Sequence, residues 1–200
     1  MVGIQETFSM RRLIEKKIGK RTEKIVNTFD SFINQGEKIL DIGAGGGWIG
    51  KEIQKRKNAE VTLLDVIDFN QTDLKLVLYD GKKIPFPDNS SDTSLLIFVL
   101  HHCNYPLEVL KEVKRATRKK IIIIEDIPTS RLNKIFLYLW DIITGLPSLT
   151  KPPGENMSFK FKTIPQWQKI FNDLQLKIIF QKQFQSNRLI RHGLFILKKC

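Results

Sequence analysis

The residues with the clearest chemical potential lie in an acidic, glycine-rich turn near residue 45. The apolar run 39–42 contains Asp41 and breaks into four glycines within residues 43–47. Glycine tolerates positive φ and has no Cβ, so backbone N–H groups can approach a ligand closely at the start of the helix expected to follow, to about Lys57. The spacing predicts a strand, a loop and a helix that together hold a nucleotide-like cofactor.

Two kinds of phosphate-binding loop compete for these glycines. The span Gly45–Lys51 nearly matches a P-loop, but Glu52 stands where Ser or Thr should reach magnesium. A dinucleotide fingerprint could begin at Gly43, but Trp48 takes the place of its third glycine. Asp41 counts against both, because a carboxylate about 4 Å from a phosphate costs on the order of 4 kcal/mol at an effective dielectric of 20.

The pattern Asp41-x-Gly43-x-Gly45-x-Gly47 instead resembles the first motif of class I S-adenosylmethionine-dependent methyltransferases. In that family the loop wraps the methionine and ribose portion of the cofactor, which carries an ammonium and a sulfonium but no phosphate. An acidic loop is then chemically sensible. The resemblance implies that Asp41, Gly43, Ala44, Gly45 and Gly47 bind S-adenosyl-L-methionine as the cofactor.

Further motifs of the same family follow in order. Asp65 closes the strand-like run 60–65, where the family's acidic residue holds the ribose hydroxyls, and Val66 is placed to cover the adenine ring. Asp80 and Gly81 resemble the adenine-contacting turn, with Asp80 accepting from the adenine amino group. Taken singly, each acid could instead be a cap or a surface residue, and Asp80 and Gly81 alone favour an ordinary turn.

The end of the fourth expected strand resembles that of the type 11-like subgroup, which acts largely on small molecules. The segment Ile97–His102 carries this resemblance and implies that Phe98 contacts the cofactor. His101 or His102 is the candidate catalytic base, because both follow the strand end where the ligand crevice of such a sheet opens. The alternative is that one histidine caps the strand and the other faces solvent. Methyl transfer requires neither, since positioning alone can supply about 7–11 kcal/mol.

Alternating apolar runs and helical segments predict an α/β fold. We expect a Rossmann-like three-layer sandwich whose mostly parallel seven-stranded sheet ends in a C-terminal antiparallel hairpin. The expected strands are residues 39–42, 60–65, 74–79, 93–100, 120–125, 176–184 and 189–197. A single domain over 1–200 would comprise leading helices (1–35), a cofactor-binding core (36–126), an acceptor-side lid and helix (127–175) and the hairpin (176–200).

Two connections of this fold are unusual. Only residues 66–73 separate the second and third expected strands, whereas a parallel crossover normally needs a dozen or more. Either this crossover is a compressed loop or the strand boundaries lie elsewhere; a short loop would open the adenine side of the site. The stretch 145–156 contains three prolines and predicts a loop over one end of the sheet.

The composition of the chain limits its plausible partners and its cellular location. The 33 Lys and Arg against 21 Asp and Glu give a net charge of +12, with ten basic residues and two acids after residue 150. This basic C-terminal region favours either RNA or a lipid surface as a partner, or is simply a solvated surface. No apolar run approaches the roughly 20 residues of a membrane span, and the N-terminus lacks a secretory pattern, so we expect a cytoplasmic protein. Cys103 and Cys200 are expected to be free thiols, and no metal site is expected.

These observations predict an S-adenosylmethionine-dependent methyltransferase that acts by in-line transfer on an unidentified small or apolar acceptor. The segment 135–140 could form a lid over such an acceptor or a buried helix, and residues 159–162 could border the acceptor or form an alternating strand. A dehydrogenase pair at Tyr79 and Lys83 is disfavoured, because a glycine turn separates them. The alternative function is an RNA-directed methyltransferase or a non-catalytic domain that binds RNA or a protein partner.

Overall fold

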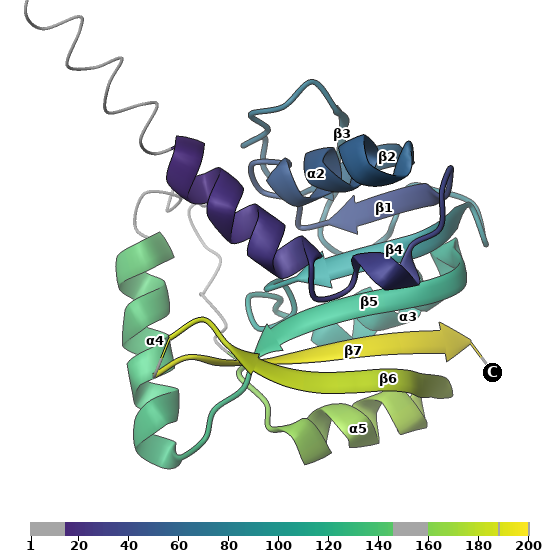
Figure 1. Cartoon of the computed structure of the whole chain (residues 1–200). Helices are drawn as coiled ribbons and strands as arrows, with labels where there is room; N and C mark the ends of the chain where they lie inside the picture. Colours follow the sequence, from purple (N-terminus) through teal and green to yellow (C-terminus); the bar gives the residue numbers. More distant parts are fainter. Residues whose placement is uncertain (1–14, 146–159, 188, 200) are drawn as a thin grey trace, which may run out of the picture. The chain divides into compact units, whose positions relative to one another are not determined.

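The structure is a computed structural model of the 200-residue chain that describes residues 15–145, 160–187 and 189–199 (Figure 1). The chain divides into two compact units, Met1–Leu78 and Tyr79–Cys200. The predicted helical residues 5–14, most of the predicted loop 145–156, residue 159 and Cys200 lie outside the described residues.

The first unit contains three parallel strands and the helix that connects two of them. Its elements are a helix ending at residue 26, the 3-10 helix η1 (Asp30–Phe32), β1 (Lys38–Ile42), α2 (Trp48–Lys57), β2 (Glu60–Asp65) and β3 (Lys75–Leu78). The strand order is β3-β2-β1. Buried parallel strands require nearly continuous apolar sequence, which the interior of β1 and β2 provides. α2 ends at Asn58, whose left-handed φ of 47° stops the helix.

The connection between β2 and β3 is a compressed loop, residues 66–74, without a helix. Asn70 organises it: the side-chain amide donates to Leu74 O at 2.9 Å, and Oδ1 accepts the Thr72 N–H at 2.9 Å. The Gln71 N–H donates to Gly46 O at 3.1 Å. Side-chain hydrogen bonds therefore replace those of a helix, which confirms the first of the two readings of this connection.

In its described residues, the second unit contains four strands and three helices. Its elements are β4 (Ser91–Ile97), α3 (Pro106–Ala116), β5 (Thr117–Asp126), α4 (Arg131–Gly145), α5 (Ile164–Asp173), β6 (Leu176–Gln185) and β7 (Arg191–Lys199). β4 and β5 are parallel, whereas β7 is antiparallel to both β5 and β6. The carboxyl ends of β4 and β5 therefore lie at the same edge as the end of β6 and the start of β7.

The helices of the second unit begin at recognisable signals. Pro106 starts α3, and a capping box of Thr163 and Gln166 starts α5. α3 packs on β5 and α5 on β6 (Figure 1). α4 is joined to the β6–β7 turn by a 2.9 Å hydrogen bond from the Asn133 side chain to Leu189 O.

The seven strands, mostly parallel with a C-terminal antiparallel hairpin, confirm the predicted Rossmann-like class. Two expectations were wrong in detail. β4 ends at Ile97 rather than residue 100, because Phe98 adopts a left-handed φ of 60° that turns the chain out of the strand. Residues 160–162 form no strand. None of the helices in the described residues is long and apolar enough to cross a membrane.

Candidate functional site

The glycine loop of the first unit is tied to the end of β2. Gly43, Gly45 and Gly47 have φ values of 64°, 52° and 77°, a region that side-chain-bearing residues rarely enter. The Gly43 N–H donates to Leu64 O at 2.7 Å, and the Gly45 N–H donates to Asp65 Oδ2 at 2.8 Å. The predicted loop residues and the predicted ribose-binding acid are thus in direct contact.

The glycines of this loop serve different purposes. A Cβ on Gly47 would lie 2.7 Å from Leu63 Cδ1 and 2.8 Å from Asn70 Oδ1, so this glycine allows close packing. A Cβ on Gly45 would meet nothing within 4 Å. The loop therefore packs tightly at Gly47 and opens into space at Gly45, as a backbone that lies against a ligand should. Ala44 contributes its carbonyl oxygen, which accepts the Gly47 N–H at 2.9 Å.

Asp41 is buried and contacts the backbone just after the glycine loop. Its side chain is buried, with 2% exposure, and Oδ2 accepts the Gly50 N–H at 3.1 Å. Burial raises the pKa of Asp41 to about 7; the Gly50 hydrogen bond lowers it and the charge of Asp65 raises it further. Gly50 has no room for a side chain, since its Cβ would lie 2.9 Å from Val61 and Leu63. The sequence analysis had treated Gly50 only as part of a false P-loop.

Asp65 retains hydrogen-bonding capacity after these contacts. Its Oδ1 accepts the Val66 N–H at 2.7 Å and its Oδ2 accepts the Gly45 N–H, which uses one lone pair on each oxygen. A carboxylate has about four acceptor sites, so two hydroxyl groups can still bind. The Val66 side chain beside it is 53% exposed and offers an apolar surface. The first unit thus presents an acceptor pair, an apolar side chain and an open backbone loop.

In the second unit, Asp80 forms a local turn. Its Oδ1 accepts the N–H groups of Lys82 and Lys83 at 2.8 and 2.9 Å, and these bonds hold the pKa of the exposed carboxyl below its usual value. Gly81 has a φ of 74°, as such a turn requires. Asp80 and Gly81 therefore form the ordinary turn that was the alternative prediction. Both hydrogen bonds of this turn use Oδ1 and neither uses Oδ2.

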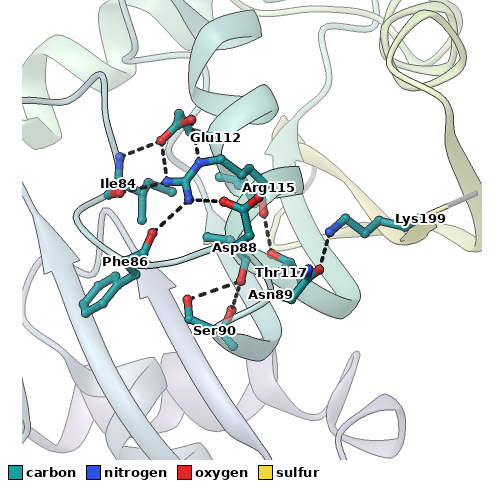
Figure 2. A network of polar contacts seen from close by, with 12 residues as sticks. Ile84, Phe86, Asp88, Asn89, Ser90, Glu112, Arg115, Thr117 and Lys199 are labelled. Atoms are coloured by element: carbon teal, nitrogen blue, oxygen red, sulfur yellow. Dashed lines mark hydrogen bonds and ion pairs between the residues drawn. The ribbon is translucent and has the colours of Figure 1, made fainter.

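Arg115 on α3 holds the segment that follows this turn, as Figure 2 shows. Its guanidinium donates to the carbonyl oxygens of Ile84 and Phe86, both at 2.9 Å, and to Asp88 Oδ1 at 2.8 Å. Glu112 accepts from the same guanidinium and from the Ile84 N–H at 3.0 Å. The sequence analysis did not single out Arg115, although it sets the course of the chain between Asp80 and β4.

The end of β4 is shaped by Glu125, the penultimate residue of β5. Glu125 Oε1 accepts the N–H groups of Val99 and Leu100 at 3.0 and 2.7 Å, and Oε2 lies 2.6 Å from His101 Nδ1. Both side chains of this ion pair are 1% exposed. Phe98 is held in its left-handed conformation by its N–H bond to Ile124 O at 2.8 Å.

The two predicted histidines have different surroundings. The His101 ring is buried and stacks on Phe161, with centroids 4.9 Å apart, whereas His102 is exposed. The two imidazole centroids lie 4.0 Å apart. Lys162, near Glu125, is partly buried, and this burial lowers the pKa of its ammonium. His101 therefore caps the strand end through Glu125, while a catalytic role for either histidine stays a prediction.

Of the predicted site residues, the first unit brings together the loop, Asp41, Asp65 and Val66. The second unit contains Asp80, Gly81, Phe98, His101 and His102. Within the ranges that the structure describes, no group of three or more His, Cys, Asp or Glu side chains could hold a metal ion.

Comparisons with known proteins indicate which protein family has this arrangement of a strand, a glycine loop and an acidic residue at the next strand end. Residues 40–124 match the family described as "Methyltransferase domain". The ubiquinone/menaquinone biosynthesis C-methyltransferase UbiE of Bordetella avium is 30% identical over 136 residues, which cover 60% of this chain and 52% of that protein. Residues 40–124 are therefore similar to a methyltransferase domain, and these findings support a class I S-adenosylmethionine-dependent methyltransferase. S-adenosylmethionine is the cofactor of this family.

Two further similarities extend this result. The sterol 24-C-methyltransferase ERG6B of Gibberella zeae is 32% identical over 99 residues, 43% of this chain and 26% of that protein. A SAM-dependent methyltransferase from Aquifex aeolicus shares the fold, with a TM-score of 0.63 at 19% identity and 88% of each chain covered. The chain spans between a quarter and about half the length of these curated relatives.

Proposed function

We propose that this chain binds S-adenosylmethionine and transfers its methyl group in line to a small, apolar acceptor. The observation that carries the proposal is the contact of the Gly45 N–H with the Asp65 carboxylate, beside the open space over Gly45. That pair joins an open backbone loop to an acceptor of hydroxyl protons, which suits a nucleoside without phosphate.

Each residue of the first unit would then have a defined task. The free acceptor sites of Asp65 would hold the ribose hydroxyls, Val66 would cover the adenine ring, and Asp80 in the second unit would accept from the adenine amino group. Asp41 would keep the loop in shape through Gly50. The bound cofactor supplies an already activated methyl group, so the protein contributes mainly orientation and exclusion of water.

An apolar acceptor agrees with two observations. The relatives named above are methyltransferases of quinone biosynthesis and of sterols. In addition, α4 exposes the large apolar side chains Leu132, Ile135, Tyr138, Leu139 and Trp140, while Leu137 is buried. The helix over 135–140 is therefore buried only on the face of Leu137 and Phe136, which pack with Phe161 and Ile190. The alternative of an acceptor-side lid is kept as part of the proposal. A single domain and a cytoplasmic location also stay predictions.

Calorimetric titration with S-adenosylmethionine, NADH and ATP tests the cofactor. We expect S-adenosylmethionine alone to bind the wild type, and Asp65→Ala to weaken it at least tenfold, because two charge-assisted hydrogen bonds are lost. Glu60→Gln, at the opposite end of β2, is the matched control and should bind normally. Tight binding of NADH or ATP without S-adenosylmethionine would overturn the proposal.

A glycine pair provides a second, independent test. Gly45→Ala and Gly36→Ala both place a Cβ at positive φ, 52° and 70°, with nothing within 4 Å. Both should cost about 1 kcal/mol of stability from backbone strain. Only Gly45→Ala should also weaken S-adenosylmethionine binding, since its Cβ enters the proposed ligand space. Equal affinities of the two variants would contradict the proposed position of the cofactor.

The net charge of +12 supports an RNA-directed or non-catalytic RNA-binding domain as a second candidate. Binding of a single-stranded RNA oligonucleotide that falls steeply between 50 and 200 mM salt, as expected for about six phosphate contacts, without methyl transfer to a small acceptor, would favour this candidate. Salt-independent methylation of an apolar acceptor would favour the first.

A further inference from the structure

The third histidine of the chain, His192, lies at the same edge of the sheet as the predicted strand-four site. It is the second residue of β7 and faces Asp126, the last residue of β5, directly across the antiparallel register. His192 Nδ1 lies 2.5 Å from Asp126 Oδ1, and the two side chains are 7% and 14% exposed. This edge is the carboxyl end of β4 and β5, where α/β sheets bind their ligands.

The Asp126 contact determines which ring nitrogen carries the hydrogen. A carboxylate only accepts, so Nδ1–H donates to Asp126 and the lone pair resides on Nε2. Among the described residues, no hydrogen bond involves Nε2. In the part of the chain that the structure describes, Trp167 Nε1 is the one fully buried side-chain nitrogen or oxygen that has no hydrogen-bond partner. Nε2 of His192 also has no partner there, so it is not fully buried. Nε2 of His192 is thus an oriented and accessible proton acceptor.

Aromatic side chains surround this imidazole. The Phe98 ring approaches it edge-on and the Phe184 ring at a tilt, each with its centroid 5.0 Å from that of His192. Phe98 is the residue that β4 holds at positive φ, and Phe184 lies opposite His192 in the β6–β7 register. Both phenyl rings are half-buried, so a planar apolar molecule could contact them while a polar group reaches Nε2.

His101 lacks this combination. It also has Nδ1 on a carboxylate, but its side chain is 1% exposed and stacked on Phe161. His102 is exposed. His192 is therefore better suited than either to contact an acceptor directly.

We propose that His192, oriented by Asp126, is a catalytic base that binds the acidic hydroxyl group of a planar, phenol-like or enol-like acceptor. This inference rests on the proposed function and names the chemical class of its acceptor. Phe98 and Phe184 contact the apolar face of the acceptor, and Asp126 is a positioning residue that acts through the imidazole.

The step balances without a further reagent. The hydroxyl proton passes to Nε2, and the electron pair left on the acceptor forms the bond to the methyl carbon as the methyl–sulfur bond breaks, its pair staying on sulfur. If oxygen is methylated, the imidazolium then gives its proton to water. If a conjugated carbon is methylated, that carbon loses its own hydrogen to water and the imidazolium returns its proton to the oxygen. One proton is released in either case.

Binding of 1-naphthol and of 1-methoxynaphthalene tests the inference, because the second probe carries a methyl group in place of the hydroxyl hydrogen and cannot donate to Nε2. Calorimetry is performed with and without S-adenosylhomocysteine. We expect the wild type to prefer 1-naphthol at least tenfold. His192→Asn keeps a donor for Asp126 but removes Nε2, so it should lose this preference while 1-methoxynaphthalene binds as before. Asp126→Asn retains the imidazole but no longer orients it, so its preference for 1-naphthol should fall severalfold. Lys182→Gln, on the exposed part of β6, is the control and should keep the full preference.

The outcomes distinguish a failure of the proposed function from a failure of the role assigned to His192. Failure of S-adenosylhomocysteine to bind contradicts the proposed function, whereas the naphthol comparison without it still tests His192. Weak binding of 1-naphthol to the wild type, or an unchanged preference in folded His192→Asn and Asp126→Asn, overturns the assignment of His192. Thermal unfolding of each variant establishes that it is folded.

Discussion

Carboxylates at strand ends have different partners in the two units of this chain. In the first unit, Asp65 accepts the Gly45 N–H of the glycine loop, and Asp41 accepts the Gly50 N–H at the start of α2. In the second unit, Glu125 and Asp126 contact the imidazoles of His101 and His192. An acid that holds backbone determines the shape of a loop, whereas an acid that holds imidazole determines where a proton can be taken up. Under the proposed function, the first unit would hold the cofactor and the second unit would position side chains for chemistry.

Glu125 combines both kinds of contact, and its removal should have the largest effect. Glu125→Ala leaves the N–H groups of Val99 and Leu100 and the His101 ring without their acceptor in a buried place. Each buried donor left without an acceptor costs about 1–3 kcal/mol, so the three together should cost at least about 3 kcal/mol. Urea unfolding should show a loss of that size.

Two comparisons make the Glu125 prediction specific. Glu125→Gln retains a carbonyl oxygen for the backbone N–H groups and should cost less than Glu125→Ala. Glu108→Ala, which removes an exposed partner of Lys111 on α3, should change stability by no more than about 0.5 kcal/mol. A Glu125→Ala loss as small as that of Glu108→Ala would show that this carboxylate does not hold the end of β4.

Asp41 should produce the next largest effect, through the pH dependence of stability. Its pKa is raised from 3.8 to about 7 in the folded protein. Between these values the folded state binds a proton that the unfolded state has released, so the free energy of unfolding falls as pH rises from about 4 to about 7. Each pKa unit corresponds to about 1.4 kcal/mol, which sets an upper limit of about 4 kcal/mol.

Asp41→Asn isolates this contribution. The amide oxygen can still accept the Gly50 N–H, but nothing titrates, so the decline between pH 4 and 7 should flatten by up to that amount. Urea unfolding of both proteins at several pH values measures it. Asp73→Asn, which removes an exposed acid two residues before β3, controls for the loss of one negative charge. Parallel pH profiles of wild type and Asp41→Asn would contradict the assignment of a buried, protonated carboxyl beneath the loop.

The two kinds of carboxylate contact also differ in how well sequence predicts them. The loop contacts join residues close to glycines whose spacing forms a recognisable motif, so Asp41, Gly45 and Asp65 could be assigned to one site. Continuous apolar runs such as Ile121–Ile124 likewise predict buried strands, because both faces are covered. These features depend on local sequence.

The imidazole contacts depend on strand register, which local sequence does not determine. His192 meets Asp126 only because β7 is antiparallel to β5 in one particular alignment, 66 residues apart in the chain. Similarly, β4 was predicted to continue to residue 100, since the apolar run gives no sign that Glu125 captures the N–H groups of Val99 and Leu100. The acids that close the β5 isoleucine run were the available signal, because they end a buried strand at the ligand-binding edge.

Asp80 shares features with both groups of carboxylates, and its substitution should have the smallest effect on stability and binding. It accepts backbone N–H groups, as the acids of the first unit do, but in an exposed turn of the second unit. Asn forms the same turn, so Asp80→Asn should leave the stability nearly unchanged. If Asp80 accepts from the adenine amino group, the variant should bind S-adenosylhomocysteine about fivefold more weakly, because a charge-assisted hydrogen bond becomes neutral.

A ligand lacking the amino donor distinguishes this contact from a general loss of charge. S-inosylhomocysteine carries an oxygen where the adenine has its amino group, so wild-type Asp80 should reject it, whereas the amide of Asp80→Asn can turn and donate to that oxygen. The preference for the adenosyl compound, measured by calorimetry, should therefore fall in the variant. A preference that is the same in both proteins would assign Asp80 to the turn alone, and the first unit would then supply the predicted nucleoside contacts through Asp65 and Val66.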